Sequence, residues 1–153
     1  MTIPNSITSI GDGAFGNCSS LTSVTLNSNA IASKTYTNSS GLRNIFGGSQ
    51  VSEYIIGNTV TAIGSYAFAG CTGLTSVVIG DSVFIIDNYA FAGTGLTSIM
   101  SMATTAPTIT NNTFQSINTG GTLTVPSDST GYDIWMGTGD YYLGKYNWTK
   151  VEQ

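Results

Sequence analysis

The feature that most constrains this chain is a segment that recurs along it. Residues 60–79, VTAIGSYAFAGCTGLTSVVI, return at residues 83–100 as VFIIDNYAFAGTGLTSIM, and residues 7–26, ITSIGDGAFGNCSSLTSVTL, follow the same pattern. Self-similarity at a period of 20–50 residues is typical of stacked-repeat folds, because a single repeat cannot bury its apolar side chains alone. The sequence therefore predicts a solenoid whose equivalent coils lie on one another.

Apolar residues stay in phase from one repeat to the next. An isoleucine column and a phenylalanine column run through four repeats, at Ile10, Ile63, Ile86 and Ile109 and at Phe15, Phe68, Phe91 and Phe114. A leucine column leads three residues later to a second apolar position, in the pairs Leu21 and Val24, Leu74 and Val77, and Leu96 and Ile99. A side chain that recurs once per coil stacks on its counterpart in the next coil. We therefore expect each column to form a continuous row inside the solenoid.

Length and local pattern set the size and class of the fold. A chain of 153 residues is one domain's worth. Thr and Val after each leucine suit a half-buried strand, and the Gly-rich residues 11–18 are too few for more than one helical turn. We predict a mostly β fold of the α/β-solenoid type. It is a right-handed solenoid of about five to six coils of 23 residues, with short strands, single helical or 3-10 turns, and a C-terminal cap.

The repeats occupy residues 1–125, and we assign residues 126–153 to a capping segment of the same domain. Residues 27–56 form a longer, irregular repeat that opens with a polar stretch at 27–40, expected to be an extended loop. Ile45 and Phe46 recover the phase of the repeat. The tail holds six of the 16 aromatic residues. We expect these rings to cover the strand edge and the apolar cross-section that a solenoid exposes at its end.

The two cysteines, Cys18 and Cys71, occupy equivalent positions with one irregular repeat between them. Neighbouring strands lie roughly 4.8 Å apart, so two coils separate these residues by about 10 Å. A disulfide needs Cα atoms within about 7 Å. We predict that both are free, buried thiols that act as small apolar side chains.

Composition excludes several kinds of partner. The chain has four basic residues against eight acidic ones, a net charge of −4 and no histidine. Nucleic acids and anionic membrane surfaces attract clustered Lys and Arg, which this sequence lacks. No apolar run is long enough to span a membrane. The residues after Met1 do not form a secretion signal. We therefore expect that Met1 is an added start residue and that further coils or a leader lie upstream in the native protein. The alternative is a genuine cytoplasmic start.

The repeats resemble the BspA-type leucine-rich repeats of bacterial surface proteins. The pattern is [VI]-x-x-I-G-x-x-A-F-x-x-C-x-x-L-x-x-[VI]-x-[IL], carried here by residues 7–26 and again by residues 60–79. The resemblance covers residues 3–125, and the tail is similar to the family's usual closing segment. The chain departs from this pattern in four places. The second repeat is long, the cysteine is missing near Thr94, Asp87 stands where the pattern has the glycine of Ile-Gly, and Ser101 takes an apolar position of a strand. The resemblance implies a secreted or surface-anchored bacterial protein, and some members bind host matrix proteins or other cells.

The sequence offers little for catalysis. Without histidine, the Ser-His-Asp and Cys-His arrangements cannot form, and zinc loses its commonest nitrogen ligand. No phosphate-binding loop is present. Asp81 and Asp87 could pair, but turns favour aspartate, and we assign them to turns. We predict no enzymatic activity, no cofactor and no metal site.

Binding remains as a function, and we expect it on the strand face. Outward residues of leucine-rich repeat strands meet the partner, and here they are Thr22, Ser23, Thr25, Ser52, Glu53, Ile55, Thr75, Ser76, Val78, Thr97, Ser98 and Met100. The alternative is that Thr simply suits an exposed strand. A second candidate is an aromatic patch of Tyr132, Trp135, Tyr141 and Tyr142, whose rings could stack on sugar rings. The alternative is that these rings serve only to cap the solenoid. The loop at 27–40 is a third candidate, or else a tolerated insertion.

Two classes of function stay open. The first is a binding module of an extracellular or cell-surface adhesin, with a protein or a glycan as its partner. The second is a structural spacer or assembly unit without a ligand, whose uncapped N-terminal edge supports end-to-end self-association. Saturable binding would favour the first class, and contacts through that edge would favour the second.

Overall fold

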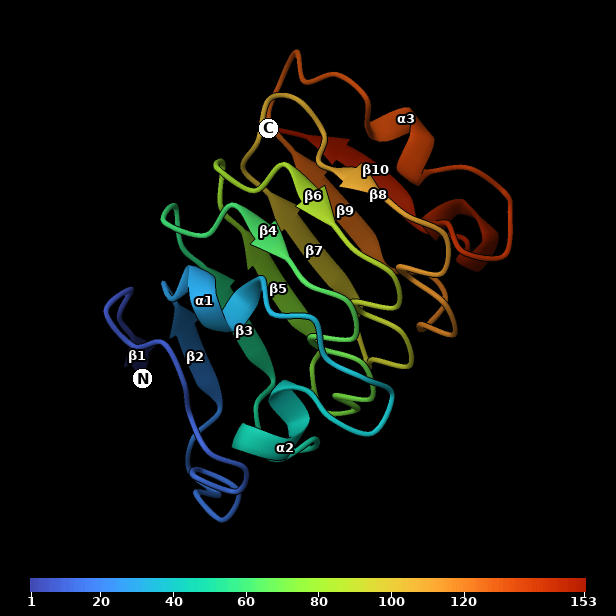
Figure 1. Ribbon diagram of the computed structural model, residues 1–153. Coiled ribbons are helices and arrows are strands. Elements are labelled where there is room, and N and C mark those ends of the chain that lie inside the picture. Colours follow the sequence, from blue (N-terminus) through green and yellow to red (C-terminus); the bar gives the residue numbers. More distant parts are fainter.

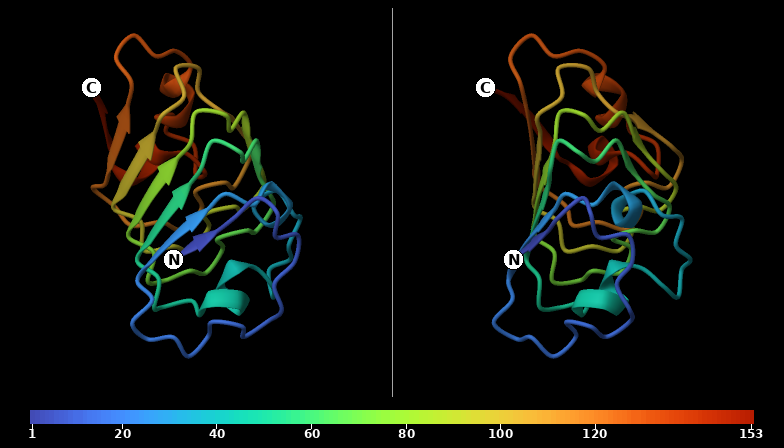
Figure 2. Two further views of the ribbon diagram at one scale, coloured as in Figure 1. Left: turned by 90° about the vertical axis from the view of Figure 1, so that its left-hand side faces the viewer. Right: turned by 60° about the vertical axis from the view of Figure 1, so that its left-hand side comes forward.

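The computed structural model describes all 153 residues as a flattened spiral with two parallel sheets on opposite walls (Figures 1 and 2). One wall is a seven-stranded sheet of order β1-β2-β3-β5-β7-β9-β10, and the other is a three-stranded sheet of order β4-β6-β8. The larger sheet consists of β1 (Thr2–Ile3), β2 (Ser23–Leu26), β3 (Glu53–Ile56), β5 (Ser76–Ile79), β7 (Ser98–Ser101), β9 (Thr122–Val125) and β10 (Thr149–Glu152). The smaller sheet consists of β4 (Ala62–Ile63), β6 (Ile85–Ile86) and β8 (Thr108–Ile109).

Every coil contributes one short strand to the larger sheet. The strands pair in parallel and in phase, so that Tyr54 lies opposite Val77, and Val77 lies opposite Ile99. In each four-residue strand from β2 to β9 the second and fourth side chains are buried and the first and third face outward. Helical structure is confined to single turns: α1 (Asn29–Ala32), α2 (Leu42–Phe46), α3 (Tyr132–Trp135) and the 3-10 turn η1 (Leu143–Tyr146). The predicted mostly β solenoid with short helical turns is confirmed.

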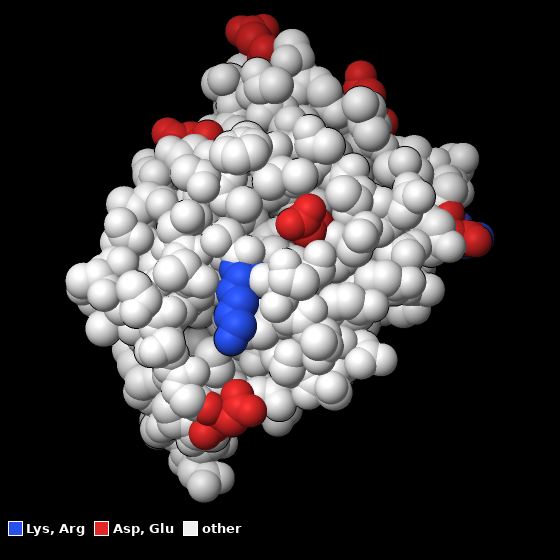
Figure 3. All heavy atoms as spheres, viewed as in Figure 1, with Lys and Arg blue, Asp and Glu red and all other residues white.

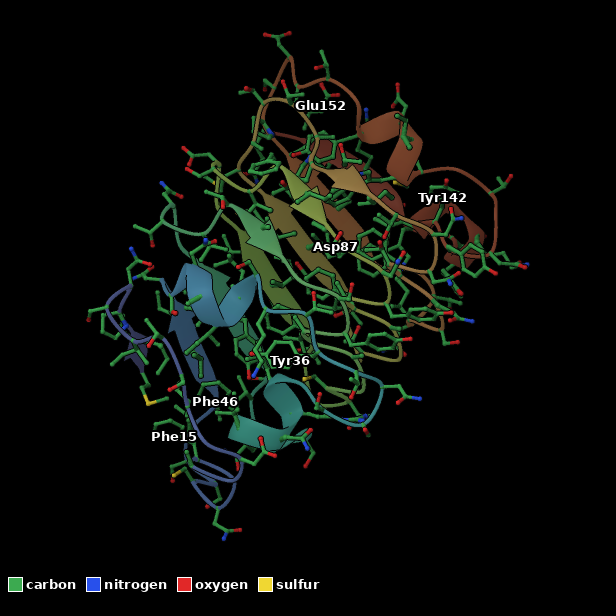
Figure 4. All side chains as sticks on the ribbon, viewed as in Figure 1. Phe15, Tyr36, Phe46, Asp87, Tyr142 and Glu152 are labelled. Atoms are coloured by element: carbon green, nitrogen blue, oxygen red, sulfur yellow. The ribbon has the colours of Figure 1, made fainter.

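The phenylalanine column forms a continuous row of aromatic contacts along the solenoid axis. Phe68 and Phe91 stack with ring centroids 5.1 Å apart, and Phe91 stacks on Phe114 at 6.0 Å. Toward the N-terminus, Phe46 of the irregular repeat continues the row, as its recovery of the repeat phase predicted, whereas the contribution of Tyr54 was not predicted. Phe15 stacks at 5.3 Å on Phe46 of the irregular repeat, as Figure 4 illustrates, and Tyr54 fills the place between Phe46 and Phe68.

Glycine permits the close stacking of coils just before the leucine column. A Cβ atom on Gly73 would lie 2.3 Å from the carbonyl oxygen of Ser49, and one on Gly95 would lie 2.4 Å from that of Thr72. Real Cβ atoms do not approach backbone this closely, so any side chain here would push neighbouring coils apart. Gly73 N–H also donates to the Gly48 carbonyl at 3.0 Å.

Residues 27–40 are more ordered than the sequence suggested, and the prediction of a purely extended polar loop was wrong. Ser28 caps α1 by accepting a hydrogen bond from the Ile31 N–H at 3.2 Å. Ile31, Ala32 and Tyr36 are buried and join the core. A serine N-cap and two buried apolar residues at the end of the turn are enough for one helical turn when that turn packs on the core.

The C-terminal segment closes the solenoid with two tryptophans and a last strand. Trp135 continues the phenylalanine row, its ring centroid 5.4 Å from that of Phe114. Trp148 covers Gly121, since a Cβ on that glycine would lie 2.4 Å from the indole. Strand β10 then pairs in parallel with β9 along its whole length. The segment therefore seals the core while also extending the larger sheet.

The N-terminal end of the solenoid is open. No coil packs beneath residues 10–21, so Ile10, Phe15 and Leu21 are only partly buried. Cys18 is exposed there for the same reason, which corrects the prediction that both thiols are buried. Cys71, which has coils on both sides, is buried and free.

Candidate functional site

The outer face of the seven-stranded sheet carries two parallel rows of side chains. Strand register defines a polar row of Ser23, Glu53, Ser76, Ser98, Thr122 and Thr149, and a mixed row of Thr2, Thr25, Ile55, Val78, Met100, Thr124 and Val151. The structure thus brings the outward residues of four predicted strands onto one surface. Sequence reasoning missed Thr122, Thr124, Thr149 and Val151, as well as Thr2. The first two could have been found, because they alternate with Leu123 and Val125, but the tail has no repeat that marks Thr149 and Val151.

Apolar side chains form the middle of the mixed row. Ile55 pairs with Val78, and Val78 pairs with Met100, so the three lie side by side across three neighbouring strands. All three are partly exposed. We name this surface the aliphatic row. Its neighbours are hydroxyl residues of the polar row, and Glu53 is the one acidic side chain among them, accepting a 2.9 Å hydrogen bond from the Ser23 hydroxyl.

The predicted residues just before each strand have a different role. The Ser52 hydroxyl donates to the Thr22 carbonyl at 3.2 Å, Thr75 to the Ser52 carbonyl at 3.2 Å, and Thr97 to the Thr75 carbonyl at 3.4 Å. Each hydroxyl therefore ties its coil to the preceding one. We call this series the hydroxyl ladder, and its donors are used within the chain rather than offered to a ligand.

A small hollow of about 170 Å³ lies beside the aliphatic row, near the C-terminal edge of the sheet. Met100, Met102, Thr124, Pro126 and Gln153 are among its lining residues. Met102 is 49% exposed, which makes it the most accessible methionine of the chain. Methionine is flexible and polarizable, and it adapts to irregular partner surfaces.

The predicted aromatic patch does not form, because the structure buries half of it. Tyr132 and Trp135 are each only 1% exposed. The Trp135 indole N–H donates to the Pro107 carbonyl at 3.0 Å, and burial raises the pKa of the Tyr132 hydroxyl. Tyr141 and Tyr142 are partly exposed in the cap, where Figure 4 labels Tyr142. The two rings that face the core act in capping and are unavailable to a sugar.

The loop at 27–40 shows one local electrostatic feature. The Lys34 ammonium lies 5.3 Å from the centroid of the Tyr36 ring, within cation–π range. Burial of Tyr36, followed by the negative charge of Asp12, raises the pKa of its hydroxyl to about 12. The Tyr36 hydroxyl donates to the Ile31 carbonyl at 3.0 Å, so this side chain holds the loop against α1.

Groups that could carry catalysis or hold a metal are dispersed. Nowhere do three His, Cys, Asp or Glu residues come close enough to hold a metal ion. Burial raises the pKa of the Cys71 thiol to about 12, so the thiolate needed for nucleophilic chemistry does not form near neutral pH. Figure 3 shows charged side chains that are few and widely spaced over the face of the smaller sheet, apart from one red and blue pair at the right-hand edge. No helix is long and apolar enough to cross a membrane.

Comparison with known proteins gives one match. The model of the family described as "BspA type Leucine rich repeat region" matches residues 1–45 and 41–134, in six copies. No curated protein and no solved structure matches the chain significantly. The matched residues include all of the repeats and the first residues of the capping segment.

Proposed function

This chain belongs to the BspA-type leucine-rich repeat family, and we propose that it is a non-enzymatic binding module that takes a protein partner on the outer face of its seven-stranded sheet. Repeat modules of this family are typically involved in protein interaction at bacterial surfaces. The first experiment tests an adhesive role outside the cell, in which the partner is a host matrix protein.

The observation that carries the proposal is the aliphatic row. Ile55, Val78 and Met100 form an uncharged band on a rigid sheet, with hydroxyl groups along one side and the small hollow at one end. The cores of protein interfaces are depleted in charged residues and enriched in methionine, while their rims are polar. A band of this kind at the centre of the sheet suits the central contacts of a partner.

The experiment measures binding of purified extracellular matrix proteins to the immobilised chain by surface plasmon resonance. We expect saturable binding of at least one of them, weakened at least tenfold by Val78→Glu, which introduces a charge into the aliphatic row. The matched control is Ile85→Glu, because Ile85, like Val78, is a partly exposed β-branched residue on a strand, but it faces outward from the smaller sheet. Equal weakening by both variants, or no binding by any protein of the panel, would contradict the proposal.

A second candidate function, an assembly unit, is favoured by the open N-terminal end. Ile10, Phe15 and Leu21 are partly exposed there, and Ile7 is 37% exposed. The outer edge of β1 is unpaired, and unpaired edges are templates for further strands. Sedimentation velocity from micromolar to millimolar chain would show concentration-dependent self-association, abolished by Leu21→Glu and unaffected by Ile85→Glu. A monomeric mass throughout this range would rule this function out.

A further inference from the structure

A hollow of about 450 Å³ lies along the turns that lead back to the larger sheet, away from the aliphatic row. Tyr66 and Tyr89 line it from two successive coils. Arg43 and Asn38 come from the irregular repeat, and Gln115 comes from a later coil. Ala and Gly residues at 69–70 and 92–93 complete most of the lining, so no bulky side chain fills the space. Pockets of this volume hold small ligands.

The two tyrosines stand where smaller residues would suffice. Their rings stack with centroids 4.8 Å apart and planes 9° apart, and both side chains are partly exposed. Their backbones are left-handed, with φ of 59° and 58°. The equivalent positions of other coils hold Gly13 and Asn112, whose residue types adopt this conformation readily. A bulky residue there is strained, and strained residues cluster at binding sites.

Arg43 gives the hollow a positive charge. Its guanidinium donates to the Asn38 carbonyl and lies against Gly70. It forms no ion pair, since the three ion pairs of the protein involve only Lys145 and Lys150. No Asp or Glu lines the hollow, although the chain as a whole carries a net charge of −4. A guanidinium presents five N–H donors in a fork that matches a carboxylate.

Three backbone donors around the hollow are already used between coils. The N–H of Tyr66 donates to the Asn88 carbonyl at 3.0 Å, and that of Gly70 to the Ala92 carbonyl at 2.8 Å. The N–H of Gly93 donates to the Gln115 carbonyl at 2.8 Å. These three donors are not free to pair with a peptide strand, so recognition here falls mainly to side chains.

We propose that this hollow binds a saccharide bearing a carboxylate. The C–H face of a sugar ring packs on tyrosine, which presents an apolar body with a polar tip. The Asn38 and Gln115 amides and the tyrosine hydroxyls supply donors and acceptors for sugar hydroxyls. The Arg43 guanidinium pairs with the carboxylate. This site and the sheet face are separate, so each can fail without the other.

The test is an NMR titration of the ¹⁵N-labelled chain with D-glucuronic acid, N-acetylneuraminic acid, D-glucose and acetate. We expect shifts around residues 66–70 and 89–93, with the two acidic sugars binding at least tenfold more tightly than D-glucose. D-glucose differs from D-glucuronic acid only at C6, where a hydroxymethyl group replaces the carboxylate. No shifts with any sugar, equal affinity for acidic and neutral sugars, or the same shifts with acetate alone would overturn the proposal. Tight binding of tetraglutamate in place of the sugars would also overturn it.

Variants of the chain separate the roles of the lining residues. Tyr66→Asn with Tyr89→Asn should weaken the acidic sugars at least tenfold, and Asn112 shows that asparagine fits this backbone. Arg43→Gln should remove the preference for a carboxylate while weak sugar binding remains. Tyr141→Asn, at a partly exposed tyrosine of the cap, and Val78→Glu, on the sheet, should leave sugar binding unchanged. Circular dichroism checks that each variant is folded. Unchanged sugar binding by a folded Tyr66→Asn/Tyr89→Asn variant would refute the assignment.

Discussion

The hydroxyls of Tyr132 and Ser101 share a hydrogen bond of 2.6 Å in the interior of the protein. Ser101 lies opposite Ile79 in the strand register and is 1% exposed, so a polar residue stands in an otherwise apolar row. The Tyr132 hydroxyl also donates to the Ala103 carbonyl at 2.8 Å. The cap therefore satisfies the one serine that interrupts the core of the strands, and the two residues form a matched pair.

Tyr132→Phe should lower the free energy of unfolding by about 1–3 kcal/mol, because it leaves buried polar groups without their partner. Urea denaturation followed by circular dichroism measures the change. Ser101→Ala in the same background should cost less than it does alone, since the unsatisfied hydroxyl is then absent. Strictly additive effects of the two changes would show that the pair is not coupled.

Gly121→Ala should destabilise the chain by about 1–3 kcal/mol, because the new methyl group collides with the Trp148 indole and displaces the cap. The matched control is Gly11→Ala, since a Cβ at Gly11 has nothing within 4 Å and the backbone there is not left-handed. Thermal unfolding of the two variants against the wild type gives the comparison. A similar loss in both would mean that Trp148 does not seal this end.

The two cysteines should react at very different rates. In the folded chain a thiol reagent such as 5,5′-dithiobis(2-nitrobenzoic acid) should modify the exposed Cys18 quickly and the buried Cys71 only as the protein unfolds. Cys18→Ser should remove the fast phase, and denaturation should reveal both thiols of the wild type. Two fast thiols in the native protein would contradict the burial of Cys71.

Stability should fall at alkaline pH. Burial raises the pKa of Cys71 from 9.0 to about 12, so the unfolded chain loses this proton first. Between these values the folded state binds more protons, and the free energy of unfolding drops by about 1.4 kcal/mol per pH unit for this one group. The contribution is fully present below pH 9.0 and is lost as the pH rises toward about 12. Urea titrations at several pH values should give a shallower decline for Cys71→Ala than for Cys18→Ala.

Repeat periodicity accounts for what the sequence predicted well. Once the positions of Phe68 and Phe91 are known to be equivalent, their contact follows, because parallel strands in phase bring equivalent side chains together. The same argument correctly placed Val77 and Ile99 in the core. The family follows from the same spacing, and the match to its repeat model confirms it.

What the sequence did not predict depends on neighbours that have no period. Cys18 and Cys71 are equivalent in sequence, yet only Cys71 has a coil beneath it, so burial differs. Tyr132 and Trp135 occupy a tail without repeats, and nothing local distinguishes an exposed ring from a capping one. The left-handed backbone at Tyr66 and Tyr89 was not predicted either, because tyrosine gives no local signal for this conformation, whereas glycine at the equivalent Gly13 adopts it readily.

The hydroxyl ladder has a consequence for whatever touches the margin of the larger sheet. Thr75 and Thr97 turn their oxygen atoms toward the chain's own carbonyls. A threonine has only one other group at the end of its side chain, which is a methyl. The sequence suggests a hydrophilic surface here, but along this border the two threonines present methyl groups. A docking molecule with an apolar margin would therefore find apolar contacts at this edge of the sheet.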